Sequence, residues 1–340
     1  MRAILVKQGK GPIENLYLGD APEPVLQYGQ ILVKIKAFGL NRMDILQREG
    51  KYPVPPGASE ILGVEFSGTV SQVGEGTTKF KVNDEVFGIA GGGAYAEYIA
   101  VDETHLLPKP SHLSFTDAAS IPEVFLTAYQ ALITYGEVKA GENVLIHTAA
   151  SGVGIAAIQL ARVKGAQAVI GTASNKEKLN WLLGIPNGLT NGVNYTTQNF
   201  AEEVKKITED KGVDVVIDFV GQSHWTKNLE SLAVDGRMTM LAMLSGTQVS
   251  EFNLAAILYK RLRIQGSTLR SRTRAYQADL IARFTRDFLE MITGKDGQGP
   301  IKTYIHQVYS WKDIQEAHRD MEGNQTMYAT FVYPTLLSPK

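Results

Sequence analysis

A turn of small residues in the middle of the chain lies between an apolar stretch and a helix-like stretch. It runs from Thr148 through Ala150, Ser151, Gly152, Val153 and Gly154. Small residues at such a turn leave backbone N–H groups open at the positive end of a helix dipole, where a pyrophosphate binds. We therefore interpret the turn as the pyrophosphate site of a dinucleotide. Close packing of helix on strand without a ligand is the alternative, because Ser151 stands where the glycine fingerprint often has glycine.

The end of the next apolar stretch indicates which dinucleotide the turn would hold. In dinucleotide-binding folds, an acid at this point binds the ribose 2′-hydroxyl and would repel a 2′-phosphate. Residues 169–176 contain no acid, and the first one is Glu177. Ser174, Lys176 and Lys178 instead offer a hydroxyl and two cations, which form charge-assisted hydrogen bonds with phosphate. The segment favours NADPH, and the alternative is that Ser174 caps the following helix while the lysines are solvated.

The residue types that are absent or scattered exclude other kinds of catalytic site. The chain has no cysteine, which excludes disulfides, thiolate zinc sites and a cysteine nucleophile. Its six histidines show no paired helical spacing, and neither a GxSxG turn nor a Walker phosphate loop occurs. His147 ends an apolar stretch, and we interpret it as a hydrogen-bonded core residue rather than a base.

A basic cluster lies between residues 260 and 274. Its members are Lys260, Arg261, Arg263, Arg270, Arg272 and Arg274, with no acid among them. The net charge of the whole chain is −1, so no overall field attracts nucleic acid or a membrane surface. We interpret the cluster as charge that guards a sheet edge or as a wall near the cofactor phosphates, and nucleic-acid binding is the less favoured alternative.

The elements that must position these residues fall into two lobes. A length of 340 residues predicts separate cores, and 44% hydrophobic with 20% charged residues is typical of soluble globular proteins. The apolar run at the N-terminus is too short for a signal peptide, and no apolar segment reaches spanning length. A cytoplasmic protein without membrane contact is expected.

Hydrophobic patterning predicts a β-rich lobe followed by an α/β lobe. Strands are predicted at 31–37, 66–73, 85–89 and 95–101. Further along, strands at 143–147, 168–172, 214–219, 238–241 and 262–269 alternate with helices near 153–165, 175–183, 199–210 and 223–233, a pattern typical of a parallel sheet. An amphipathic helix over 275–293 and strands at 301–308 and 328–333 are predicted to return to the first lobe.

Motifs that occur in one order along nearly the whole chain resemble those of a known family. They are Leu40-Asn-Arg-Met-Asp44, Gln47-Arg-Glu-Gly-Lys-Tyr52, Pro55-Pro-Gly-Ala-Ser59, Ile61-Leu-Gly-Val-Glu-Phe-Ser-Gly68, Ala119-Ser-Ile-Pro122, Leu126-Thr-Ala-Tyr129, Ala156-Ala-Ile-Gln-Leu160, Leu269-Arg-Ser-Arg272 and Ile314-Gln-Glu-Ala-His318. In these motifs the chain resembles the zinc-free quinone oxidoreductases of the medium-chain dehydrogenase/reductase superfamily. It looks most similar to the tumour-suppressor-inducible branch, which is similar at Ser151.

The resemblance implies an α/β fold with a GroES-like catalytic lobe at 1–121, a Rossmann NADPH-binding lobe at 122–267, and a C-terminal return at 268–340. Zinc-dependent relatives place metal ligands where this chain has Asn41 and Val64. Because alcohol oxidation in those relatives needs zinc to polarise an oxygen, the resemblance implies metal-free reduction of an electron-poor acceptor, such as a quinone, by NADPH.

The same resemblance assigns site residues. Ala150, Ser151, Gly152, Val153 and Gly154 match the pyrophosphate turn. Ser174 and Lys178 match the 2′-phosphate binders, with Lys176 as an alternative, and Tyr195 matches a tyrosine beside that ribose. The nicotinamide side would include Asn41, Thr127, Gly221, Met243, Leu244, Leu269, Arg270 and Ser271.

Tyr52 stands where the family presents an aromatic ring to the quinone, on which it could stack or to which it could donate a proton. Alternative interpretations remain for three residues: Asn41 as a turn residue, Thr127 as a threonine buried in a helix, and Tyr52 packed on neighbouring prolines. The tail 326–332 lacks the glycine and basic residue that many relatives carry near the cofactor.

Two other functions stay open at this level. An alkenal or enone double-bond reductase also accepts hydride at carbon without a metal. The non-enzymatic alternative is an NADPH-binding protein with little turnover, either crystallin-like or RNA-binding. A homodimer is expected through edge-to-edge pairing of the strand from Leu262 to Leu269, as in relatives.

Overall fold

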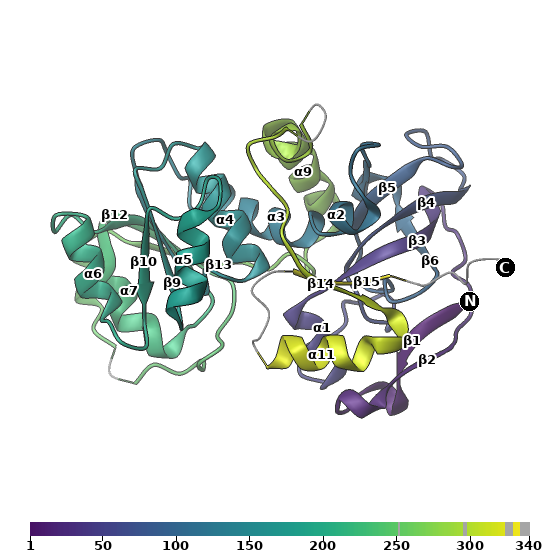
Figure 1. Ribbon diagram of the computed structural model, residues 1–340, viewed down its shortest axis with the longest axis horizontal. Helices are drawn as coiled ribbons and strands as arrows, with labels where there is room; N and C mark the ends of the chain where they lie inside the picture. The colour runs from purple at the N-terminus through teal and green to yellow at the C-terminus, as the bar shows by residue number, and fades with distance from the viewer. Residues whose placement is uncertain (251, 295–297, 324–328, 334–340) are drawn as a thin grey trace. The chain divides into compact units, whose positions relative to one another are not determined.

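The computed structural model describes residues 1–250, 252–294, 298–323 and 329–333 (Figure 1). The chain divides into two compact units. The first contains Met1–Glu123, Arg270–Gly299 and Thr303–Lys340, and the second contains Val124–Leu269 and Pro300–Lys302. The predicted α/β class, with a β-rich lobe and a parallel-sheet lobe, is confirmed.

The second unit is built on a six-stranded sheet in the order β10-β9-β8-β11-β12-β13, and every pairing in it is parallel. The strands are β8 (Asn143–Ile146), β9 (Ala168–Ala173), β10 (Asn191–Asn194), β11 (Val213–Asp218), β12 (Leu232–Met240) and β13 (Arg263–Gly266). The helices are α4 (Gly152–Val163), α5 (Lys176–Gly184), α6 (Phe200–Ile207), α7 (Trp225–Ser231) and α8 (Ala255–Tyr259). Strand order reverses between β8 and β11, and in doubly wound folds this is where ligands bind.

Burial explains why the parallel strands read as continuous apolar runs. In β8, Val144, Leu145 and Ile146 are each fully buried, because both faces of the sheet lie in the interior. Helix α4 is buried from Gly154 to Ala161, which includes the polar Gln159. The Gln159 side chain forms two hydrogen bonds with the backbone of Lys302: its Nε2 donates to the carbonyl oxygen, and its Oε1 accepts from the N–H.

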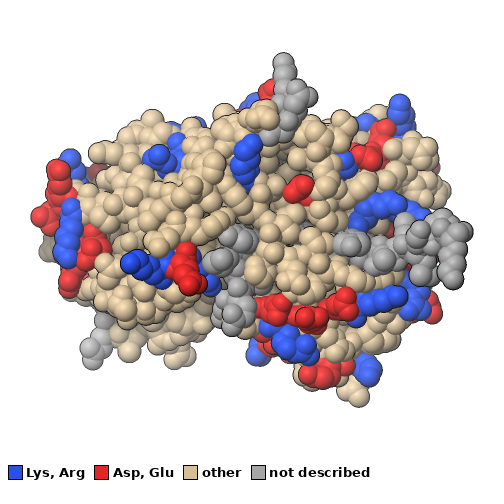
Figure 2. Space-filling model, viewed as in Figure 1, with Lys and Arg blue, Asp and Glu red and all other residues tan. Residues whose placement is uncertain are grey.

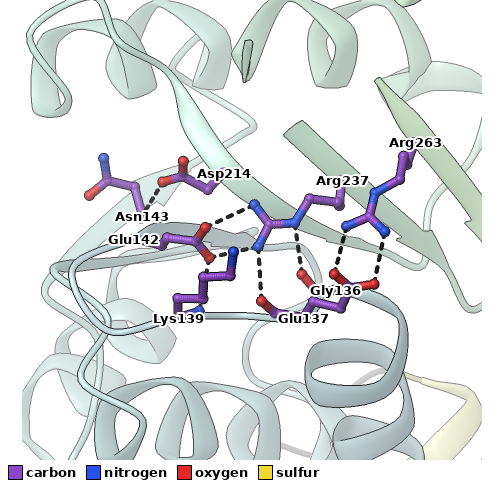
Figure 3. A network of polar contacts seen from close by, with 8 residues as sticks. All are labelled: Gly136, Glu137, Lys139, Glu142, Asn143, Asp214, Arg237 and Arg263. Carbon is purple, nitrogen blue, oxygen red and sulfur yellow. Dashed lines mark hydrogen bonds and ion pairs between the residues drawn. The ribbon is translucent and has the colours of Figure 1, made fainter. Parts of the chain in front are cut away.

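One polar network in this unit joins the loop before β8 to the neighbouring strands (Figure 3). Arg237 on β12 is buried and donates to the carbonyl oxygens of Gly136 and Glu137 and to both carboxylate oxygens of Glu142. Arg263 on β13 forms a bidentate pair with the Glu137 carboxylate at the exposed surface. The network therefore holds residues 136–142 against the first residues of the parallel sheet.

The first unit contains a seven-stranded sheet ordered β14-β15-β3-β4-β5-β7, with β6 paired to β3, and a separate β1-β2 hairpin. Its strands are β1 (Arg2–Val6), β2 (Leu16–Asp20), β3 (Gln30–Leu40), β4 (Glu65–Val73), β5 (Glu85–Ile89), β6 (Tyr98–Asp102), β7 (Leu106–Pro108), β14 (Ile305–Ser310) and β15 (Ala329–Tyr333). Its helices include α1 (Arg42–Arg48), α2 (Phe115–Ala119), α9 (Arg274–Phe284), α10 (Glu290–Thr293) and α11 (Ile314–Glu322), and α3 (Pro122–Tyr129) begins where this unit ends. Strand β15, which lies near the C-terminal end of the chain, pairs antiparallel with β3 in this sheet.

Several elements differ from the predictions for physical reasons. The strand predicted at 262–269 is limited to Arg263–Gly266, since it pairs only with β12. The helix predicted at 275–293 is interrupted by a π-helical segment over Thr285–Leu289. Strand β10 was not predicted, because its short sequence buries only Val193 and shows no alternation. Strand β12 starts at Leu232, and the preceding helix ends at Ser231.

Candidate active site

The small-residue turn after β8 contains the N-cap residue of helix α4. Ser151 caps α4 by accepting a hydrogen bond from the Gly154 N–H at 3.1 Å. The first N–H groups of an α-helix have no acceptor within the helix, so those of Gly152 and Val153 stay at its open end. A Cβ added to Gly154 would lie 2.6 Å from the Thr148 carbonyl oxygen, so the turn admits only glycine there without a shift.

Beside this turn, His147 is a fully buried core residue, as predicted. Its Nδ1 lies 2.9 Å from the Thr172 hydroxyl, and its Nε2 lies 2.7 Å from Asn228 Oδ1. Burial, together with the neighbouring His224, lowers the pKa of His147 to about 3. The ring is therefore neutral at physiological pH and supports the carboxyl ends of the strands.

The ends of β9 and β10 bring Ser174 and Tyr195 to the same edge of the sheet. The Tyr195 N–H donates to the Ala173 carbonyl oxygen at 3.3 Å, and the Tyr195 ring lies edge-on to His224, with 5.7 Å between ring centroids. The cap of α5 is Asn175, whose side chain accepts from the Lys178 N–H at 2.9 Å. The alternative that Ser174 caps this helix is therefore wrong. Ser174 is exposed just before α5.

The second unit contains five further residues that were predicted on the nicotinamide side: three in the loops after β11 and β12, and two near the first and last residues of the unit. Gly221 and Met243 follow β11 and β12 and line a pocket of about 230 Å³ that also includes Trp225 and Phe252. Leu244 is exposed in the same loop, where its N–H donates to the Phe219 carbonyl oxygen at 3.1 Å. Thr127 is half-buried on α3, and Leu269 is buried at the last residue before the chain re-enters the first unit.

In the first unit, Asn41 is held by two buried carboxyl groups. It precedes α1, and its backbone N–H donates to Asp44 Oδ2 at 2.8 Å. Its side-chain Nδ2 donates to Glu65 Oε1 at 2.8 Å, while the other Glu65 oxygen accepts from the Glu123 N–H at 2.9 Å. Asp44 and Glu65 are both fully buried. The orientation of the Asn41 amide is therefore fixed from within the lobe.

Sequence reasoning missed Asp44 and Glu65 as parts of this arrangement. Their signals were present: Asp44 stands three residues after Asn41, in the spacing of a capping box, and Glu65 starts a strand and is followed there by five apolar or small residues. Burial, together with the nearby negative charge of Glu123, raises the pKa of Glu65 to about 8. Burial also raises the pKa of Asp44 to about 6. At neutral pH, Glu65 is mostly protonated.

The raised pKa of Glu65 makes the stability of the protein depend on pH. A carboxyl whose pKa is higher in the folded state stabilises the fold fully below about 4.5 and loses this contribution as the pH rises through about 8. We expect Glu65→Gln to remove this dependence, because the new side-chain amide is neutral at every pH. The free energy of unfolding of the wild type should then fall relative to the variant between those two pH values.

Chemical denaturation at a series of pH values measures this difference. Glu75→Gln, at an exposed glutamate in the same lobe, is the matched control and should follow the wild-type profile. Parallel profiles of wild type and Glu65→Gln would show that Glu65 is ionised in the fold at neutral pH.

Tyr52 lies against the segment that starts at Arg270. The Arg270 guanidinium carbon is 5.6 Å from the centroid of the Tyr52 ring, and Arg270 Nε donates to the Gly91 carbonyl oxygen at 2.8 Å. Burial and the charge of Glu123 raise the pKa of Tyr52, whereas the cation of Arg270 lowers it. The phenol is thus neutral at physiological pH. Ser271, the next residue along the chain, is exposed.

The basic cluster is largely engaged in contacts within the protein. Lys260 donates to the carbonyl oxygens of Leu229, Glu230 and Leu232. Arg261 and Arg263 form ion pairs with Asp235 and Glu137. On the face drawn in Figure 2, acidic and basic side chains are interspersed. These pairings match the interpretation of the cluster as charge at a sheet edge, since β13 is the last strand of its sheet.

Asn41 and Val64 do not form part of a metal-binding group. Across the described part of the chain, no three His, Cys, Asp or Glu side chains are grouped as metal ligands would be. Val64 is almost fully buried and apolar, and the Asn41 amide donates to a carboxyl group. None of the helices in the described ranges is long and apolar enough to cross a membrane.

The second unit has the features that a nicotinamide dinucleotide needs. The backbone at Gly154 has no room for a Cβ, and the helix start directly beyond Ser151 offers N–H groups to a pyrophosphate. Ser174 directly follows β9 and Lys178 lies in the first turn of α5, near the strand end where a ribose of such a ligand binds. The residues present in the second unit therefore fit a nicotinamide dinucleotide.

Comparisons with known proteins agree with this fold. Residues 27–111 match the family described as "Alcohol dehydrogenase GroES-like domain", and residues 152–286 match "Zinc-binding dehydrogenase". A quinone oxidoreductase of Sus scrofa is 33% identical over 324 residues, which cover 94% of each chain. A synaptic vesicle membrane protein VAT-1 homolog of Danio rerio is 31% identical over 332 residues, covering 94% of this chain and 67% of that protein.

Among solved structures, the Escherichia coli quinone oxidoreductase complexed with NADPH superposes with a TM-score of 0.84 at 31% identity, covering 98% of this chain and 99% of the other. Identity above 30% over almost the full length of a relative, together with both domain matches, confirms the family resemblance. The chain therefore belongs to the medium-chain dehydrogenase/reductase superfamily, as an oxidoreductase related to the quinone oxidoreductases.

Proposed function

We propose that the protein is an NADPH-dependent reductase of quinones or similarly electron-poor acceptors that works without a metal. The observation that carries this proposal is the segment directly after β9, where Ser174 and Lys178 offer a hydroxyl and a cation and where residues 169–176 contain no acid. The E. coli relative was solved as a quinone oxidoreductase with NADPH, which supports both the cofactor and the acceptor class.

The residues of this chain would act mainly by positioning. NADPH, when bound, supplies the hydride. The open N–H groups of Gly152 and Val153 would hold its pyrophosphate, and Ser174, Lys178 and Tyr195 would hold the 2′-phosphate end. Asn41, fixed by Glu65 and Asp44, would present a rigid amide to the nicotinamide side. Tyr52 would offer a ring face or its phenol proton to the acceptor.

Turnover with defined acceptors tests the acceptor class. Purified protein with NADPH should reduce a simple benzoquinone well above the uncatalysed background, and faster than an acyclic enal under matched conditions. Preference for the enal would favour the double-bond reductase. Tight NADPH binding without turnover of either acceptor would overturn the proposal in favour of a nucleotide-binding role.

The cofactor preference gives a second, separate prediction. Lys178→Ala should weaken NADPH binding by about tenfold or more while changing NADH binding little, because charge-assisted hydrogen bonds to phosphate are worth roughly 1.5–3 kcal/mol. Titration of each dinucleotide by intrinsic fluorescence measures both constants.

Lys176→Ala is the matched control for this substitution, since Lys176 is exposed at the first residue of the same helix. A larger loss of NADPH binding in Lys176→Ala would assign the phosphate contact to that lysine. Equal losses of NADPH and NADH in Lys178→Ala would refute the phosphate role.

We also propose a homodimer through β13, the final strand of the parallel sheet. An edge strand offers unpaired backbone groups to a second copy. Light scattering on the purified protein should give twice the mass of the chain, and a monomer at micromolar concentration would refute this pairing.

A further inference from the structure

A chain of hydrogen bonds between buried polar side chains lies inside the first unit, and the proposed function does not use it. Its members are Arg48 and Asp44 on α1, His318 on α11, and Tyr95 in the segment before β6. At most 1% of each residue is exposed. Buried polar groups cost free energy unless they are paired, so a group of four in one core needs an explanation.

The neighbours of His318 determine which of its ring nitrogens carries the proton. A guanidinium can only donate, so Nδ1 of His318 accepts from Arg48 Nη1, 3.5 Å away. The ring is neutral, because burial, together with the cation of Arg48, lowers the pKa of His318 to about 3. The single proton of the neutral ring is therefore on Nε2, which lies 3.2 Å from the Tyr95 hydroxyl oxygen.

The direction of the remaining bonds follows from this tautomer. Since Nε2–H of His318 donates to the Tyr95 oxygen, the Tyr95 hydroxyl proton is donated to Asp44 Oδ2, 3.3 Å away. Asp44 Oδ2 also accepts from the Asn41 N–H at 2.8 Å, and Oδ1 accepts from the Gly63 N–H at 3.2 Å. With a pKa of about 6, Asp44 is mostly ionised at neutral pH, and an ionised carboxylate is the species that accepts from all three donors.

The packing around Tyr95 holds its hydroxyl in place. The Phe38 ring stacks on the Tyr95 ring, with 4.5 Å between centroids. A Cβ added to Gly63 would lie 2.4 Å from Tyr95 Cδ1, so only glycine fits there without a shift. At the other end of the chain, Arg48 forms an ion pair with Glu322, the last residue of α11. The hydrogen bonds therefore connect α11 to the residue that precedes α1.

We propose that His318 and Tyr95 are positioning residues for Asn41. They extend hydrogen-bond donation from Arg48 to the Asp44 carboxylate, and this carboxylate holds the Asn41 backbone N–H. A buried carboxylate that loses one donor shifts toward its remaining donors, and Asn41 shifts with it. The inference rests on the proposed function, in which Asn41 presents its amide to the nicotinamide.

Tyr95→Phe is the principal test, because it removes the hydroxyl and keeps the ring that Phe38 and Gly63 contact. With NADPH and a benzoquinone, kcat should fall by about tenfold or more, since a small displacement of a positioned group slows the chemical step. The dissociation constant of NADPH should stay within about twofold, because the residues proposed to bind its phosphates belong to the second unit. Tyr98→Phe, at a half-buried tyrosine on β6 whose ring faces Lys34, is the matched control and should keep both wild-type values.

A pair of substitutions at His318 separates positioning from stability. His318→Gln keeps an amide N–H that can donate to Tyr95, whereas His318→Leu has no donor. We expect kcat to be about threefold or more higher in His318→Gln than in His318→Leu, because only the first can continue the chain to Asp44. A purely structural role would lower the melting temperature of both variants and leave kcat at the wild-type value.

Nitrogen NMR of the wild-type protein tests the direction of the chain without turnover. The His318 ring should show the neutral Nε2–H form throughout the range from about pH 5 to pH 8, in which an ordinary histidine titrates. The signal that disappears in His318→Gln identifies this ring among the histidines. An Nδ1–H form, or titration of His318 near the ordinary pKa of histidine, would overturn the proposal.

The kinetic outcomes are equally decisive. Wild-type kcat in Tyr95→Phe would refute this inference alone and leave the reductase function in place. No turnover of any acceptor by the wild type would refute the proposed function and this inference together. If Tyr95→Phe does not fold, as judged by circular dichroism, the His318 pair decides, and equal kcat in His318→Gln and His318→Leu would overturn the positioning role.

Discussion

Gly154→Ala should weaken dinucleotide binding at least about tenfold, because the loss of even one hydrogen bond to a charged group costs roughly 1.5–3 kcal/mol. The added Cβ would lie 2.6 Å from the Thr148 carbonyl oxygen and 2.7 Å from the Ala149 carbonyl oxygen. These are backbone atoms, which cannot move aside as a side chain can. The start of α4 must therefore shift, and its open N–H groups shift with it. Overpacking of this kind also costs about 1–3 kcal/mol of stability.

Gly184→Ala is the matched control, because Gly184 ends α5 and nothing lies within 4 Å of a Cβ built on it. Dinucleotide titration and thermal unfolding of both variants measure the two effects. Wild-type affinity in Gly154→Ala would show that the turn does not hold the pyrophosphate, and the ligand-free packing alternative would then be favoured.

Arg237→Met should destabilise the second unit by about 3–5 kcal/mol, the range for breaking a buried ion pair from one side. The substitution leaves the Glu142 carboxylate and the carbonyl oxygens of Gly136 and Glu137 without their shared donor (Figure 3). Only 9% of the Arg237 side chain and 18% of the Glu142 side chain is exposed, so water replaces these bonds poorly.

Arg263→Met provides a control on the neighbouring strand. Its pair with Glu137 has side chains that are 55% and 51% exposed, and exposed pairs contribute roughly 0–1 kcal/mol. Urea unfolding followed by tryptophan fluorescence compares the variants, since Trp181 and Trp225 both belong to the second unit. Similar losses in the two variants would mean that burial does not strengthen the Arg237 network.

Local patterns predicted much of the second unit because its elements are regular and continuous. The apolar run that became β8, the small-residue turn and the dense apolar helix α4 are all local signals. Strand β10 escaped prediction, since pairing with β9 rather than an apolar pattern makes it a strand. Ser151 was identified at the turn, but its role as the cap of α4 depends on the backbone geometry at Gly154.

In the first unit, the site was less predictable because its contacts join distant segments. Asn41, Glu65 and Glu123 meet through hydrogen bonds that span 24 and 58 residues of chain. Arg270 reaches Gly91 across 179 residues. A local sequence pattern cannot predict contacts between residues so far apart in the chain. The sequence marked Asn41 and Arg270 through motif resemblance, whereas their partners and the raised pKa of Glu65 follow from burial.

By itself, the sequence determined the class of the fold, the turn of small residues before a helix and the absence of thiol chemistry, because composition and short-range periodicity carry that information. It also led to the proposal of NADPH, since the acid-free stretch around Ser174 is contiguous. The tertiary structure decided which side chains are charged and which polar atoms have hydrogen-bond partners. Burial keeps Glu65 mostly protonated near neutral pH, and packing leaves two nitrogens of Arg270 without a partner among the described residues. Both depend on desolvation, which only the folded chain creates.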